Sequence, residues 1–179
     1  ASKHLDYDDY ADLDATGKAV LVIRREPQQN LETSPFDGKR TSDYATFEYK
    51  ASNAFQHGAK LLLIVNDLAG LNGEADALIP FARAGTDSVS KLPIVFLTRS
   101  YADQLLAAAG EPSLTDLENA IDDDLKPRSR ELKGLKLTAK LPVVRTAIET
   151  KNVIGVLEGS GPHPDETIVV GGHYDHLGR

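Results

Sequence analysis

The chain contains neither cysteine nor methionine among its 179 residues. Without cysteine it can form neither disulfides nor thiolate zinc sites, although this absence does not decide the compartment. Without methionine it lacks an initiating residue, so we expect a processed product or a piece of a longer protein. The sequence therefore leaves imidazole, carboxylate and other oxygen groups as its metal-binding chemistry.

Long apolar runs and an excess of positive charge are also missing. No apolar stretch approaches the roughly 20 residues that a membrane-spanning helix needs, and no signal-peptide pattern opens the chain. The formal net charge is −7, and no basic stripe interleaved with aromatic residues occurs. We therefore expect no membrane and no nucleic acid as partner. The hydrophobic content of 41% is ordinary for a globular protein and is enough for one core plus a small appendage.

The first 16 residues are rich in aspartate and tyrosine and sustain no helical or strand period. We interpret residues 1–16 as a solvated loop. A calcium-binding loop is the alternative, but the spaced Asp-x-Asp-x-Asp-Gly pattern that would support it is absent.

Three apolar runs, at residues 19–25, 59–65 and 91–97, predict β-strands. The first run is apolar on both faces, which predicts a central strand. It ends in Arg24 and Arg25, which we interpret as solvated strand-end charges rather than as an anion site. Residues 28–44 and 66–90 are rich in turn-forming residues and predict long loops.

Apolar residues at spacings of three and four predict a helix over residues 44–57. Thr41 or Ser42 is its expected N-terminal cap, and Gly58 stands where a left-handed C-terminal cap belongs. His57 is interpreted as a helix-end or surface residue rather than as a metal ligand. A second, short helix is expected from a cap at Ser100 to Gly110.

A third helix is expected to begin at Ser113, where Asp116 completes a variant capping box. Residues 122–124 are three aspartates, which oppose the helix dipole, and we interpret them as a fraying, solvated end rather than as a metal site. Residues 135–139 alternate between apolar and polar side chains and predict a half-exposed strand, which Pro142 bends or ends.

The last stretch carries the strongest chemical signal. Ile168 to Val170 predicts a buried strand, two glycines follow, and His173, Asp175 and His176 come next. A neutral imidazole is a zinc ligand, and a nearby carboxylate can fix its tautomer. In an extended chain residues 173 and 175 share a face while 176 points away, so a self-contained site of these three side chains is disfavoured.

Residues 152–159, of sequence Asn-Val-Ile-Gly-Val-Leu-Glu-Gly, and residues 166–178 together resemble the opening hairpin of the catalytic domain in co-catalytic di-zinc aminopeptidases. The resemblance implies that His173 is a metal ligand for one of two zinc ions. It also implies that Asp175 is a catalytic residue that supports this ligand. The remaining zinc ligands and the glutamate that acts as general base would lie beyond Arg179.

A second resemblance covers roughly residues 7–110. The segments 17–22 (Gly-Lys-Ala-Val-Leu-Val), 50–59 (Lys-Ala-Ser-Asn-Ala-Phe-Gln-His-Gly-Ala) and 92–96 (Leu-Pro-Ile-Val-Phe) resemble the protease-associated domain. The resemblance implies an α/β (α+β) fold, a swivelling-type β/β/α sandwich without chemistry of its own. We therefore expect a protease-associated domain at residues 1–140, with its N-terminal strand missing, and the linker and truncated first peptidase hairpin at residues 141–179.

The sequence thus predicts a fragment of a secreted, periplasmic or cell-envelope zinc aminopeptidase that acts on peptide substrates in the parent protein and is inactive alone. The alternatives are a non-catalytic protein- or peptide-binding module and a chain whose metal site is completed by a partner. The missing strand should leave an open sheet edge. We expect the C-terminal hairpin to add onto this edge or to exchange with a second chain, which would give a homodimer.

Overall fold

The computed structural model describes residues 7–79, 92–142 and 151–173. The chain divides into a first compact unit, residues 1–139, and a second unit, residues 140–179. None of the helices in these ranges is long and apolar enough to cross a membrane.

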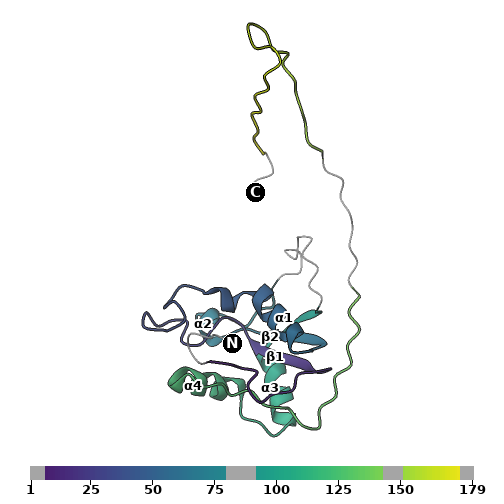
Figure 1. The fold of residues 1–179 in the computed structure, drawn as a ribbon. Coiled ribbons are helices and arrows are strands. Elements are labelled where there is room, and N and C mark those ends of the chain that lie inside the picture. Colours follow the sequence, from purple (N-terminus) through teal and green to yellow (C-terminus); the bar gives the residue numbers. More distant parts are fainter. Residues whose placement is uncertain (1–6, 80–91, 143–150, 174–179) are drawn as a thin grey trace. The chain divides into compact units, whose positions relative to one another are not determined.

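The first unit is built around a three-stranded parallel sheet with the order β1-β2-β3 (Figure 1). Its strands are β1 (Ala19–Ile23), β2 (Leu61–Val65) and β3 (Ile94–Leu97), close to the three predicted runs. All five residues of β2 are buried, because β2 pairs with a strand on each side and is covered on both faces. The central strand is therefore β2, and the prediction that β1 is central is wrong. Within the described ranges β1 pairs with β2 alone, so its outer edge and the homodimer stay predictions.

In the described ranges, four α-helices and one 3₁₀ turn accompany the sheet, and their N-terminal caps differ in part from the predicted ones. Thr46 accepts a hydrogen bond from the backbone N–H of Tyr49 and caps the first α-helix, whereas the predicted cap Ser42 accepts from Tyr44 and caps the 3₁₀ turn before it. Thr98, rather than Ser100, caps the helix after β3, whereas the predicted cap at Ser113 is confirmed. The elements are η1 (Asp43–Ala45), α1 (Phe47–Gln56), α2 (Leu68–Leu71), α3 (Arg99–Ala108) and α4 (Leu114–Asp124).

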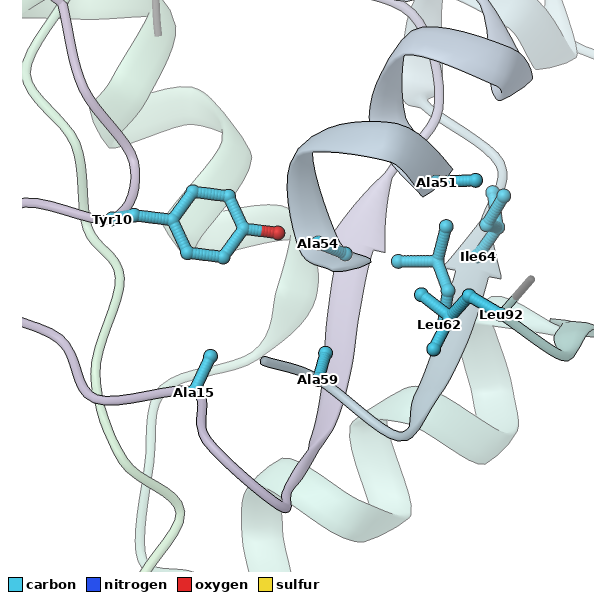
Figure 2. Packing of buried hydrophobic residues seen from close by; sticks show 8 residues of the cluster. All are labelled: Tyr10, Ala15, Ala51, Ala54, Ala59, Leu62, Ile64 and Leu92. Atoms are coloured by element: carbon cyan, nitrogen blue, oxygen red, sulfur yellow. The ribbon is translucent and has the colours of Figure 1, made fainter. Parts of the chain in front are cut away.

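One face of the sheet packs against α1 (Figures 1 and 2). Small residues on the helix let it approach the strands closely, and Ala54 is fully buried there. The alternation of β2 sends Leu62 and Ile64 into this layer, as the two-residue period of a strand requires. The buried cluster consists of Tyr10, Ala15, Ala51, Ala54, Ala59, Leu62, Ile64 and Leu92.

The opposite face of the sheet packs against α3 and α4. Val65 at the end of β2 contributes to this second cluster, together with Ala102 and Leu106 of α3 and Leu114 of α4. Leu132, beyond α4, also packs against it. The sheet is thus covered on both faces, which is the usual arrangement for parallel strands.

The N-terminal segment is not a solvated loop throughout, so that prediction is partly wrong. Tyr7 and Tyr10 are each only 8% exposed. The ring of Tyr10 points at α1 in Figure 2 and stacks on His57, with centroids 4.1 Å apart. Burial raises the pKa of Tyr10 to about 12. Sequence periodicity could not show this, because isolated aromatics in a polar segment carry no helix or strand pattern.

Three predicted strands are not seen in the described residues. Residues 135–139 contain no strand, and neither do residues 151–173, which hold both halves of the expected hairpin. The mixed α/β class is confirmed for the first unit. The second β-layer of a swivelling sandwich and the C-terminal hairpin stay predictions.

Gly58 occupies the predicted left-handed position, with φ +80°, between α1 and β2. A side chain there meets two obstacles. The backbone angle disfavours it, and an added Cβ would lie 3.1 Å from Thr16 Oγ1 and 3.2 Å from Thr16 Cα. Gly58 is therefore required both for the end of the helix and for the close approach of the segment before β1.

We expect Gly58→Val to lower the free energy of unfolding by more than the roughly 1–2 kcal/mol that a left-handed L-residue costs, because crowding against Thr16 adds to it. Gly110→Val is the matched control. Gly110 has φ +75° but open space around it, so its substitution carries the backbone cost alone. Chemical denaturation of both variants measures the difference, and equal losses would contradict the role of Thr16.

Candidate functional site

The predicted metal ligand His173 lies at the end of the described part of the second unit, in an exposed stretch without helix or strand. Asp175 and His176 lie outside the described residues. Within the described ranges no group of three or more histidine, cysteine, aspartate or glutamate residues is arranged to hold a metal ion. The zinc site and the roles of His173 and Asp175 therefore stay predictions.

The described part of the second unit exposes its large aliphatic side chains. Residues 153, 154, 156 and 157 are 81–96% exposed, and residues 168–170 are 87–93% exposed. A folded monomer seldom leaves such a concentration of aliphatic residues in water. The two runs that flank the polar turn therefore lack an apolar surface against which to pack.

In the first unit, polar side chains gather at the carboxyl edge of the parallel sheet. Asn66, directly after β2, is the central member. Its side-chain amide donates to Asp76 Oδ1 at 2.9 Å and accepts from Arg24 at 3.3 Å. Arg24 also lies over the ring of Phe47, 5.4 Å from its centroid. The interpretation of Arg24 as a solvated strand-end charge is therefore wrong.

A buried ion pair anchors α3 to α4 at the same edge. Arg99 Nη1 and Glu118 Oε2 are 2.7 Å apart, and each residue is 8% exposed. Glu118 also accepts the backbone N–H of Leu68 at 2.6 Å, and Arg99 donates to the carbonyl oxygen of Asn66 at 2.7 Å. Burial raises the pKa of Glu118, although the hydrogen bonds from Leu68 and Arg99 act in the opposite direction. The pair thus ties the end of β2 to both helices.

Among the described carboxylates of this edge, Asp67 has an oxygen without a partner. It is 3% exposed, caps α2 by accepting the N–H of Gly70 at 2.8 Å, and lies 3.7 Å from Arg25. Its Oδ1 has no hydrogen-bond partner within the described part of the chain. Arg25 is consequently engaged with a carboxylate and is not a solvated end charge as predicted.

Lys50 of α1 interacts with three carboxylates near the same edge of the sheet. Burial lowers the pKa of Lys50, while the carboxylates of Asp9, Glu26 and Asp67 act in the opposite direction. Glu26 in turn accepts both the N–H and the hydroxyl of Ser42. One ammonium group thus interacts with three carboxylates, and the hydrogen bonds from Ser42 fix the position of Glu26.

Two of the three aspartates at the end of α4 have partners. Asp122 accepts the backbone N–H of Gln28 at 2.8 Å, and burial raises its pKa. Asp124 pairs with Arg128 at 2.7 Å, and this hydrogen bond holds the pKa of Asp124 below its ordinary value. The helix continues through Asp124, so the prediction of a fraying end is wrong, whereas Asp123 and Asp124 are exposed as predicted. Gln28, 94 positions away, supplies the partner of Asp122.

An open hollow of about 450 Å³ lies on the first unit beside η1 and the start of α1. It combines two carboxylates with two tyrosines, whose rings meet edge to face with centroids 5.0 Å apart. Acidic groups beside aromatic faces are complementary to a cationic group. The hollow is lined by Asp37, Thr41, Ser42, Asp43, Tyr44 and Tyr49.

Sequence reasoning missed the buried ion pair, the carboxyl-edge network and the hollow. Arg99 had a weak signal, since it lies two residues after a predicted strand, while Asn66 directly follows another. Glu118 had none, because a glutamate in an amphipathic helix is most often solvated.

Comparison with known proteins supports the assignment of the first unit. Residues 2–105 match the sequence model of the PA domain, a protease-associated module. Neither a curated protein nor a solved structure matches the chain. The matched segment covers more than half of the 179 residues and includes the sheet, α1 and most of α3. The chain therefore belongs to the PA-domain family.

Proposed function

We propose that this chain joins a PA domain to the first part of the catalytic domain of a zinc-dependent aminopeptidase. The observation that carries the proposal is the second unit: two aliphatic runs, exposed by more than 80%, precede the His-x-Asp motif of His173 and Asp175. Burying such side chains stabilises a fold by about 1.5–3 kcal/mol each. A domain that packs against these two runs would therefore be stabilised by their burial.

The residues present do not by themselves fit a zinc ion. Zinc in proteins takes three or four protein ligands, and the described residues bring no such group together. In the proposed enzyme His173 would be one ligand, and Asp175 would accept the other N–H of that imidazole and fix its orientation. The two zinc ions, the peptide substrate and a secreted or cell-envelope location belong to this proposal.

We expect the 179-residue chain to bind zinc weakly and to lack peptidase activity, because a single imidazole cannot close a tetrahedral site. Calorimetric titration with zinc tests this, and a tight one-to-one site would contradict it. In the longer protein that supplies the remaining ligands, His173→Ala should lose bound zinc and activity together.

His163→Ala is the matched control in the longer protein. His163 lies in the same unit, is exposed, and sits 3.3 Å from Glu166. Its substitution should leave zinc content and activity unchanged. A His173→Ala variant that retains both would remove His173 from the site.

A non-catalytic, peptide-binding module is the second candidate. The hollow beside η1 favours it, because its carboxylates and tyrosines suit a basic side chain or a peptide amino terminus. A longer protein without bound zinc would support this candidate over the enzyme.

A further inference from the structure

The segment that leaves the first unit after α4 is basic and exposed. All residues from 133 to 142, which we call the lysine segment, are exposed, and none belongs to a helix or strand. Its three leucines are 39–45% exposed, and its lysines are exposed as well. Residues 126–142 contain six basic and one acidic side chain, although the whole chain carries a net charge of −7.

The chain is held firmly just before this segment. Arg128 pairs with Asp124 at 2.7 Å, Arg130 pairs with Glu111 at 2.9 Å, and Glu131 pairs with Lys18 at 2.9 Å. Leu132 packs against the cluster beneath α3 and α4. Among the described residues, Leu132 is the last that packs against a core cluster, and the lysine segment begins at the next residue.

We propose that the Lys136–Leu137 and Lys140–Leu141 peptide bonds are cleavage sites for a serine endopeptidase directed at lysine and arginine. Such an enzyme binds a basic side chain in an acidic pocket and requires an accessible, extended backbone on both sides of it. In the reaction the C–N bond breaks, water supplies the hydroxyl of the new lysine carboxylate, and the leucine nitrogen leaves as a protonated amine. Both lysines stand in exposed chain without helix or strand.

Three of the other basic residues are less suitable, each for a physical reason. Lys126 is followed by Pro127, whose ring fixes φ and removes the N–H at the bond to be cut. Lys133 lies in a turn with Gly134, which has φ +78°. Lys60 lies directly before β2, and its N–H bonds to the carbonyl oxygen of Lys18 at 2.8 Å.

The position of these two bonds gives the cut a defined consequence. Everything that packs into the two described core clusters lies at or before Leu132, while His173 lies after the cut. Cleavage would therefore release the PA domain intact from the segment that carries the proposed zinc ligand. The accessibility of the bonds does not depend on the proposed function.

Limited digestion of the full chain with trypsin, followed by intact mass measurement, tests the proposal. We expect the first large fragments to end at Lys136 and Lys140, and the digested protein to melt at the temperature of the intact one. Lys136→Gln/Lys140→Gln should slow the first cleavage at least tenfold. Lys39→Gln/Lys60→Gln, which removes two exposed lysines of the folded unit, should not change it.

First fragments that end at any other lysine or arginine would overturn the proposal. So would a Lys136→Gln/Lys140→Gln variant that is cut as fast as the parent, or a loss of melting cooperativity on cleavage, since the cut would then fall within the folded unit.

Discussion

Replacing Arg99 with alanine is expected to destabilise the first unit by about 3–5 kcal/mol, because it leaves the carboxylate of Glu118 buried without its cation. The substitution also removes the donor to the Asn66 carbonyl oxygen at the end of β2. Urea denaturation followed by circular dichroism measures the loss. A value under about 1 kcal/mol would show that the pair is solvated and of the ordinary surface kind.

Two controls separate the buried charge from simple loss of contact. Lys39→Ala breaks the exposed pair with Glu32, 3.1 Å apart, and should cost no more than about 1 kcal/mol. The double variant Arg99→Met/Glu118→Leu removes both charges and keeps much of their volume. It should recover most of the stability that Arg99→Ala loses, because no unpaired charge is then buried.

Ile64→Ala is expected to cost about 2–5 kcal/mol, since Ile64 lies fully buried at the centre of β2 and its neighbours cannot collapse into the cavity. The side chain projects towards α1, where alanines already bring the helix close to the sheet (Figure 2). Thermal and chemical denaturation should both show the loss.

Val153→Ala tests whether an apolar residue of the second unit contributes as much to stability as one of the first unit. Val153 is 87% exposed, so its truncation should change the unfolding free energy of this chain by less than about 0.5 kcal/mol. A loss comparable to that of Ile64→Ala would show that residue 153 is buried in solution and would contradict the exposed second unit.

The sequence by itself determined the elements whose signals are local. Continuous runs of β-branched residues and leucine predicted all three strands, because a strand that is covered on both faces shows no alternation of apolar and polar residues. Apolar residues at spacings of three and four predicted α1 and α4. A left-handed residue at a helix end favours glycine, which predicted the role of Gly58. The PA-domain family could be inferred for the same reason, since its signature consists of these local runs.

Tertiary structure alone decided which strand is central, which charges are buried and which tyrosines belong to the core. Tyr10 enters the core because His57, 47 positions away, presents a flat ring to it. Arg99 and Glu118 are buried because α3 and α4 pack on the same face of the sheet, which brings residues 19 positions apart into contact. In each case the partner is distant in sequence, and the free energy of burying a polar group depends on that partner rather than on its neighbours along the chain.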